Sequence, residues 1–214
     1  METALSDYIE QHSSPEPDYL QRINRYTHLH VLNAHMLSGR VQGRLLSMLS
    51  RMIAPQHILE IGTYTGYSAL CLAEGLASDG QLLTIERNDE LEELIRRHLA
   101  LSPLGDRVSL RIGSALEIVP ALPKERLFDL IFIDGDKREY DAYLDVVLPR
   151  VAKGGWIMAD NTLWDGHVTD PQYDHDAQTL ALRRFNDRVA ADERLEKVIL
   201  PVRDGLTIIR PLGV

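Results

Sequence analysis

Two apolar runs in the second half of the chain each end on oxygen-bearing side chains. In "LIFIDGDKREY" the run stops at Asp134, with Asp136 and Lys137 close behind, and in "GGWIMADNTLWDG" it stops at Asp160 and Asn161. Carboxylate and amide oxygens suit hard cations, Mg²⁺ first and Ca²⁺ or Mn²⁺ as alternatives, whereas Zn²⁺ favours His and Cys. We therefore expect a cation site made of Asp134, Asp160 and Asn161. The competing interpretation is that these residues only form turns and helix caps.

The elements that would position these side chains follow from hydrophobic patterning. Strands are expected at 57–62, 81–86, 108–113, 128–134, 155–160, 196–202 and 205–210. The first five are nearly continuous in apolar character and alternate with helical stretches, which is typical of strands buried on both faces of a parallel sheet. Only a short gap separates the last two, which therefore form an antiparallel hairpin at one edge. The pattern predicts an α/β, doubly wound, seven-stranded sheet that is mostly parallel.

In a doubly wound sheet the carboxyl ends of parallel strands share one edge. Neighbouring strands lie about 4.8 Å apart, so side chains at their ends can bind one ion. The first 54 residues look mostly helical, with Pro15 and Pro17 marking a helix start. We expect residues 1–54 to cap the core or form a dimer surface, and residues 55–214 to form the core within one structural domain.

Composition limits the classes of protein that fit. The chain has 214 residues, 44% of them hydrophobic, and a net charge of −9. The acidic charge argues against broad nucleic-acid binding, which requires a basic surface. No apolar stretch approaches the roughly 18 residues of a membrane span, and the acidic N-terminus does not resemble a signal peptide. The only cysteine is Cys71, which fits a reducing cytoplasm.

A glycine loop indicates a nucleoside ligand. "LEIGTYTGYSA" places Gly62 and Gly66 between the first strand and the first helix, and Glu86 ends the second strand. An acid at that position usually accepts hydrogen bonds from ribose hydroxyls. The motifs that bind a dinucleotide or a triphosphate are absent, so the expected ligand lacks phosphates. S-adenosylmethionine (SAM) fits, with Ser114 and Ala115 beside its adenine.

Six segments together resemble the cation-dependent class I O-methyltransferases of the caffeoyl-CoA and catechol type. They are "HMLSGRVQGRLL", "LEIGTYTGYSALCLA", "TIER", "FIDGDKREY", "ADNTLWDG" and "RDGLTII", in the family's order from about Met36 onward. The resemblance implies a Rossmann-like fold, SAM, metal ligands Asp134, Asp160 and Asn161, and Lys137 as the catalytic lysine. It places the cofactor against Ser38, Glu60, Gly62, Ser68, Glu86, Ala115 and Asp136, to which we add Thr63, Ser114 and Asp134.

The acceptor side is matched less well. Plant members carry an Asn where this chain has Asp165, and the N-terminal region, which shapes the family's acceptor site, matches least. Trp164 and Tyr143 are candidates for an aromatic acceptor wall, although core packing would also explain them. His167 is the only histidine near the expected cation loop, and Cys71 is interpreted as a core residue.

The expected chemistry is methyl transfer to a small hydroxylated aromatic. A phenol has a pKa near ~10, and a bound cation lowers the pKa of a coordinated oxygen, so a metal-bound phenolate would attack the methyl group. Asp134 would take part by holding the cation, and two adjacent hydroxyls, as in a catechol, could chelate it. Lys137 would act as a base if its site lowers its pKa, and otherwise as an orienting charge.

Other functions also fit the sequence. Some bacterial relatives methylate 5-hydroxyuridine in tRNA, and the N-terminal arginines could form a local basic face for it; these are Arg22, Arg25, Arg40, Arg44 and Arg51. A non-catalytic nucleoside-binding protein is a further alternative, and an NAD-dependent dehydrogenase fits less well without the dinucleotide motif. Family members are usually dimers, so a homodimer is expected, without membrane partners.

Overall fold

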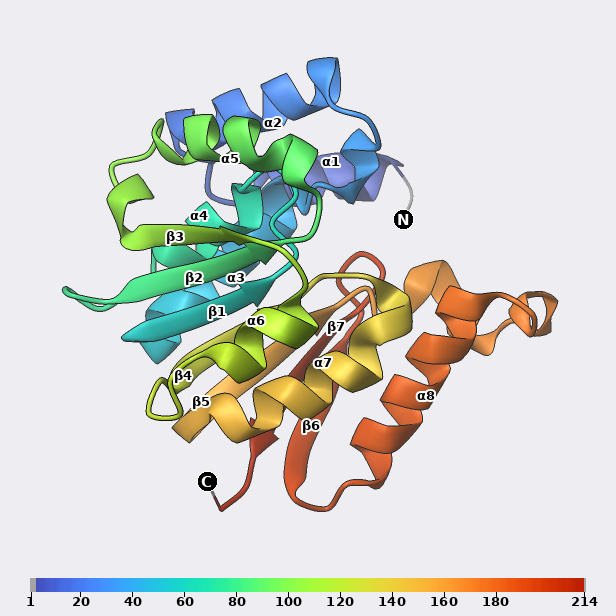
Figure 1. The fold of residues 1–214 in the computed structure, drawn as a ribbon. Coiled ribbons are helices and arrows are strands. Elements are labelled where there is room, and N and C mark those ends of the chain that lie inside the picture. The colour runs from blue at the N-terminus through green and yellow to red at the C-terminus, as the bar shows by residue number, and fades with distance from the viewer. Residues whose placement is uncertain (1–2, 214) are drawn as a thin grey trace.

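The computed structural model describes residues 3–213 and contains a seven-stranded sheet (Figure 1). The strands lie in the order β3-β2-β1-β4-β5-β7-β6. The chain builds the sheet outward from β1 to one side and then from β4 to the other, as in a doubly wound sheet. Their bounds are β1 His57–Ile61, β2 Gln81–Glu86, β3 Val108–Ile112, β4 Phe128–Ile133, β5 Val151–Asp160, β6 Leu195–Leu200 and β7 Leu206–Pro211. The predicted fold class is confirmed.

Alternate residues of the central strands enter two separate cores. Ile58 and Leu130 belong to the core on one face of the sheet, and Leu59 and Ile131 belong to the core on the other. The first core is covered by α2 (Asp18–His30), α3 (Gly39–Ile53), α4 (Tyr67–Ala73) and α5 (Glu92–Leu99). The second is covered by α6 (Ala115–Ala121), α7 (Tyr140–Val147) and α8 (Ala177–Ala191) (Figure 1). Burial on both faces explains the continuous apolar runs.

Strand β5 begins earlier than its sequence pattern suggests. We expected it at Gly155, but Val151 already pairs with Phe128 of β4. The register shifts between Phe128 and Leu130, and Gly154 has a positive φ of 76°. The extra residues therefore form an irregular start to the strand, which apolar patterning alone does not reveal.

The antiparallel hairpin brings the end of the chain to the carboxyl edge of the sheet. Strand β7 pairs antiparallel with both β6 and β5, and Leu206 lies opposite Asp160. The turn before β7 uses Arg203, with φ 51°, and Gly205, with φ 97°. Because β7 runs against β5, the turn that starts β7 lies beside the end of β5.

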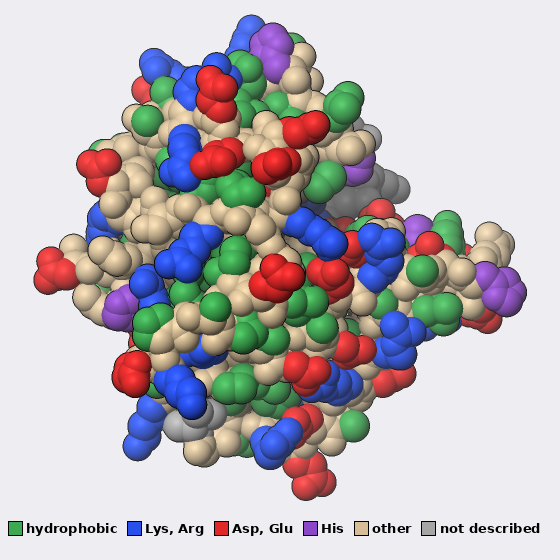
Figure 2. Space-filling view, viewed as in Figure 1, with side chains coloured by type: hydrophobic (Ala, Val, Ile, Leu, Met, Phe, Trp, Pro, Cys, Tyr) green, Lys and Arg blue, Asp and Glu red, His purple; other side chains and the backbone are tan. Residues whose placement is uncertain are grey.

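The surface carries charges of both signs, interspersed over the face seen in Figure 2. Several large apolar side chains are also exposed, among them Met48 and Met52 on α3 and Val198 and Ile199 on β6. Within residues 3–213, no helix has the length and apolar character needed to cross a bilayer.

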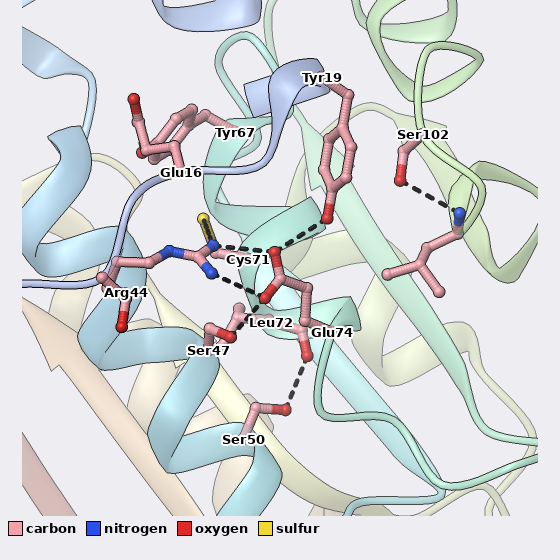
Figure 3. A network of polar contacts seen from close by, with 12 residues as sticks. Glu16, Tyr19, Arg44, Ser47, Ser50, Tyr67, Cys71, Leu72, Glu74 and Ser102 are labelled. Carbon is pink, nitrogen blue, oxygen red and sulfur yellow. Dashed lines mark hydrogen bonds and ion pairs between the residues drawn. The ribbon is translucent and has the colours of Figure 1, made fainter. Parts of the chain in front are cut away.

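Helices α2 and α3 are joined to the core through Glu74, which follows α4 (Figure 3). Its carboxylate accepts hydrogen bonds from Tyr19 of α2 at 2.9 Å, from Ser47 of α3 at 2.6 Å and from both terminal nitrogens of Arg44 at 2.8 and 2.9 Å. Burial alone would raise the pKa of Glu74, but these hydrogen bonds lower it to about 2. Helices α1 (Thr3–Gln11), α2 and α3 all precede β1.

Candidate active site

A cavity of 1120 Å³ opens at the carboxyl edge of the parallel strands. The ends of β1, β2, β4 and β5 contribute Ile61, Glu86, Asp134 and Asp160 to its lining, and one wall is the segment 30–38. A volume of this order accommodates a nucleoside together with a small second ligand, since ordinary ligand sites measure about 300–1,000 Å³. The cavity therefore lies where open α/β sheets bind their ligands.

Gly62 allows two strands to approach closely beneath this cavity. Its backbone N–H donates to Ile85 of β2, while the N–H of Asp134 donates to Ile61 of β1. Gly62 has φ 95°, and a Cβ on it would lie 2.1 Å from the backbone oxygen of Asp134. Only glycine fits there, because the left-handed conformation and the backbone contact both exclude a side chain.

Glu86 closes the glycine loop from the neighbouring strand. Its Oε2 accepts from the backbone N–H groups of Thr63 at 3.0 Å and Tyr64 at 2.7 Å, and its Oε1 accepts from Asn88 at 2.8 Å. A carboxylate offers about four acceptor sites, so three protein contacts leave capacity for a ligand hydroxyl. Glu86 lines the cavity, as the prediction of a ribose contact requires.

Glu60 lies behind the cavity wall instead of lining it. Its side chain is fully buried, Oε2 accepts from the hydroxyl of Thr84 at 2.5 Å, and Oε1 has no partner among the described residues. Burial raises the pKa of Glu60 to about 8, although hydrogen bonds from Ser68 and Thr84 lower it in part. Ser68, in contrast, lines the cavity.

Lys137 is held between an acid and a phenol. Its ammonium group donates to Oδ1 of Asp134 at 2.8 Å and to the hydroxyl of Tyr140 at 3.0 Å, and Tyr140 donates to the backbone oxygen of Asp160 at 2.8 Å. Burial alone would lower the pKa of Lys137, but the charge of Asp134 and contacts with Tyr140 raise it above its ordinary value. Lys137 is therefore a cation in this structure, and it lines the cavity.

Asp160 is the last residue of β5, and Asn161 follows it directly. Asp160 is 2% exposed, and its pKa is raised to about 7 by burial and by the negative charge of Asp134. Gln42 of α3 donates its side-chain amide to Oδ2 of Asp160 at 2.5 Å. Asn161 has a left-handed backbone with φ 58°, and its side-chain N–H donates to Asp204 at 2.7 Å.

The residues present fit a hard divalent cation. Asp134, Asp160 and Asn161 all line the cavity, and burial together with the negative charge of Asp134 raises the pKa of Asp160. The amide of Asn161 gives its N–H to Asp204 and so keeps its oxygen for another partner. The set is two carboxylates and one amide; residues 3–213 contain no cluster of three His, Cys, Asp or Glu side chains able to hold an ion. All-oxygen sets of this kind suit Mg²⁺, Ca²⁺ or Mn²⁺.

Most residues singled out from the sequence line this cavity. They are Ser38, Gly62, Thr63, Ser68, Glu86, Ser114, Ala115, Asp134, Asp136, Lys137, Tyr143, Asp160, Asn161 and Trp164. Asp136 is also paired with Arg138, which lowers the pKa of its carboxyl. Asp165 is not among the lining residues, although its neighbour Trp164 is, and His167 stacks on Tyr173 at 3.5 Å between ring centroids.

Sequence reasoning missed four residues that hold this site together. Gln42, Tyr140, Arg203 and Asp204 contact Asp160, Asn161 or Lys137, or one another. One signal was available for Asp204: an edge hairpin whose last strand pairs with β5 must bring its turn next to Asp160. Gln42 lies within the segment "HMLSGRVQGRLL", but no local pattern pairs it with Asp160, which lies 118 positions later.

The arginines considered as a basic face are mostly paired within the protein. Arg44 and Arg51 contact Glu74, with the side chain of Arg44 only 13% exposed. Arg40 donates to the backbone oxygens of Ser13 and Ser14. The side chain of Arg44 is therefore withdrawn from solvent, whereas that of Arg51 is 60% exposed, so these contacts remove Arg44 but not Arg51 from a basic face.

Comparisons with known proteins identify the family of this chain. Residues 10–212 match the family model described as O-methyltransferase. Caffeoyl-CoA O-methyltransferase of Eucalyptus gunnii is 36% identical over 220 residues, covering 97% of this chain and 87% of the relative. The O-methyltransferase TomG of Streptomyces achromogenes, solved in complex with SAM, is 30% identical with a TM-score of 0.89 and covers 100% of both chains.

A second solved structure is the O-methyltransferase of Bacillus cereus in complex with SAH. It is 31% identical, has a TM-score of 0.89 and covers 98% of this chain and 97% of its own. The matched segment includes the glycine loop, the acid that ends β2 and the cavity residues described above. The chain therefore belongs to the O-methyltransferase family and is a SAM-dependent O-methyltransferase.

Proposed function

We propose that this enzyme methylates one of two adjacent hydroxyls on a small aromatic acceptor and that it requires a divalent cation bound by Asp134, Asp160 and Asn161. Mg²⁺ is the first candidate, with Ca²⁺ and Mn²⁺ as alternatives. The observation that carries the proposal is that these three side chains line one cavity with the glycine loop. Burial raises the pKa of Asp160, and repulsion by the charge of Asp134 raises it further. A cation would remove that repulsion.

The residues of this chain have distinct parts in the proposed reaction. When bound, the cation would supply positive charge that favours the ionised form of an acceptor hydroxyl. Lys137 contributes a second positive charge, which its 2.8 Å contact with Asp134 directs to the same region. Glu86 and the glycine loop hold the nucleoside of SAM, and fixed alignment of the two substrates provides much of the acceleration.

The acceptor wall is proposed to be aromatic. Trp164 and Tyr143 line the cavity; Trp164 is only partly buried against the core, whereas Tyr143 is 4% exposed and belongs to it. A planar ring packs well against such side chains. We propose Trp164 as an acceptor contact, whereas the location of Asp165 outside the cavity lining gives less support to a direct role for Asp165.

The cation requirement is tested by chelation. Purified enzyme is incubated with labelled SAM and a catechol, and methyl transfer is measured before and after EDTA treatment. Turnover should disappear with EDTA and return when Mg²⁺ is added in excess. Activity that is insensitive to chelation would remove the cation from the proposal but leave SAM-dependent methylation intact.

The acceptor is tested with a screen that includes hydroxylated tRNA. Methylation of 5-hydroxyuridine in tRNA is the rival activity, and the burial of Arg44 beside Glu74 gives it less support. Labelled SAM is offered with catechols and with tRNA containing 5-hydroxyuridine. Transfer to tRNA alone would replace the small-aromatic proposal, and SAM binding without transfer to any acceptor would favour a non-catalytic role.

We further propose that the enzyme is a homodimer in the cytoplasm. Exposed apolar side chains on α3 and β6, Met48, Met52, Val198 and Ile199, support a protein contact surface. Cys71 is buried and unpaired, which agrees with a reducing compartment. Light scattering coupled to size exclusion measures the mass of the assembly, and a monomeric mass at working concentrations would contradict the dimer.

A further inference from the structure

We propose that Asp204, in the turn between β6 and β7, is a positioning residue that holds Asn161 in the orientation needed to bind the cation. The inference rests on the cation site proposed above and goes beyond its three ligands. Asp204 lies outside that ligand set, yet it touches the loop after β5 through both its side chain and its backbone.

The side-chain contact determines which end of the Asn161 amide is free. Nδ2 of Asn161 donates to Oδ2 of Asp204 at 2.7 Å. An ionised carboxylate can only accept hydrogen bonds, so it selects the NH₂ end of the amide. The carbonyl oxygen is then the end left for a cation, which is the atom that hard cations bind. Without Asp204, the amide could rotate and present its NH₂ group to the ion.

Backbone contacts fix the same loop against the turn. The N–H groups of Leu163 and Trp164 donate to the backbone oxygen of Asp204 at 2.8 and 3.0 Å, and Thr162 donates to Gly205 at 3.1 Å. These bonds hold the loop in which Asn161 and Trp164 have left-handed backbones, with φ 58° and 47°. Such conformations are unfavourable for residues with a side chain and persist when surrounding contacts impose them.

The neighbouring Arg203 supports Asp160, the proposed cation ligand that ends β5, through Gln42. Its guanidinium donates to Oε1 of Gln42 at 3.4 Å, and Nε2 of Gln42 donates to Asp160 at 2.5 Å. Because a guanidinium only donates and a carboxylate only accepts, the amide of Gln42 has one orientation between them. Arg203 also donates to the backbone oxygens of Leu37 and Ser38, and so attaches the cavity wall to the turn.

These contacts make the turn a support for Asp160 and Asn161 from two sides. Residues that orient metal ligands in this way typically change metal affinity by about 10- to 100-fold when they are removed. For Asp204 the effect should pass through Asn161, and this distinguishes positioning from a general effect of negative charge near the ion. A double-mutant cycle separates the two.

The experiment measures Mn²⁺ binding to the full-length protein by electron paramagnetic resonance, in the absence of any acceptor. The variants are Asp204→Ala, Asn161→Ala and the double variant, with Asp187→Ala, an exposed acid on α8, as the charge-matched control. We expect Asp204→Ala to weaken Mn²⁺ binding by at least about tenfold in the wild-type background and by less than about twofold when Asn161 is already Ala. The control should match the wild type.

Each result has a defined meaning. An equal loss in both backgrounds, or no loss in the wild-type background, would overturn the positioning role of Asp204. The cation proposal requires that the wild type binds Mn²⁺ at a saturable site and that Asp160→Ala removes this binding. If either result is absent, the cation proposal is overturned, and this inference with it. Circular dichroism and SAM affinity report folding. If Asp204→Ala does not fold, the isosteric Asp204→Asn replaces it in the same cycle, with an expected loss of Mn²⁺ affinity of about threefold. An unchanged Mn²⁺ affinity in Asp204→Asn would overturn the positioning role.

Discussion

The ammonium nitrogen of Lys137 lies 2.8 Å from Oδ1 of Asp134, three positions earlier in the chain. The side chains are 10% and 19% exposed, so the pair is largely withdrawn from water. The short turn after β4 produces this contact, because Asp136 caps the 3₁₀ helix Lys137–Glu139 by accepting from the N–H of Arg138. One local motif thus places the carboxylate of Asp134, the helix cap Asp136 and the ammonium group of Lys137 at the same edge of the sheet.

Replacing Lys137 by Met should lower kcat by about 100-fold, since it removes a positive charge from a site that excludes water. Lys137→Arg keeps the charge but changes its shape and should retain more activity. SAM affinity, measured by calorimetry, should change little in either variant. An unchanged kcat in Lys137→Met would contradict the proposed role. Because the substitution also leaves Asp134 without its partner, thermal stability must be measured alongside.

Asp134→Ala should abolish cation-dependent transfer, with a loss of at least about 100-fold in kcat/KM, while SAM still binds. The reason is that Asp134 supplies one of only two carboxylates in the proposed cation set. Mn²⁺ binding and SAM binding are measured separately on the same preparation. Asp106→Ala, which removes an exposed acid before β3, is the control. Full activity in Asp134→Ala would show that the two strand ends do not share an ion.

Gly62→Ala should destabilise the protein by about 3 kcal/mol or more and impair SAM binding. Its Cβ would meet the backbone oxygen of Asp134 at 2.1 Å, and the backbone there has little freedom to move. Gly154 offers a matched control: it also has positive φ, but a Cβ on it meets nothing within 4 Å. Gly154→Ala should therefore cost only about 1–2 kcal/mol. Urea denaturation of both variants gives the comparison, and equal losses would refute the steric explanation.

Glu74→Gln should destabilise the protein by about 3 kcal/mol at pH 7, because the pKa of Glu74 falls from 4.5 to about 2 on folding. A carboxyl with a lowered pKa contributes stability above its unfolded pKa and loses it as the pH falls. The difference between wild type and variant should therefore shrink between pH 4.5 and 2. Denaturant titrations at pH 7 and pH 3 measure it.

The control for Glu74 is Glu92→Gln. Glu92 pairs with Arg96 on the surface of α5, where the two side chains are 43% and 56% exposed. An exposed pair of this kind contributes about 0.5 kcal/mol or less, so Glu92→Gln should change stability little at any pH. Similar losses in Glu74→Gln and Glu92→Gln would contradict the assignment of Glu74 as a buried junction of three helices.

Strand positions could be predicted from the sequence because the burial of each strand is reflected in its own run of apolar residues. Residues such as Ile58 and Leu59 enter two different cores, so the run stays apolar on both faces. Parallel strands then bring their ends to one edge, which was enough to place Asp134 and Asp160 at a common cavity. Irregularities such as the early start of β5 at Val151 could not be predicted, because bulges depend on the partner strand.

The choice of side-chain partners was decided by the tertiary structure. The contacts of Gln42 with Asp160 and of Asp204 with Asn161 join residues 118 and 43 positions apart, and no local pattern specifies them. The same holds for Arg44, whose charge meets Glu74 inside the protein. Local sequence determined the strands and the acids at their ends because periodicity and strand termini are properties of short segments. Orientation, burial and pairing of those acids depend on packing between distant segments, which only the folded chain establishes.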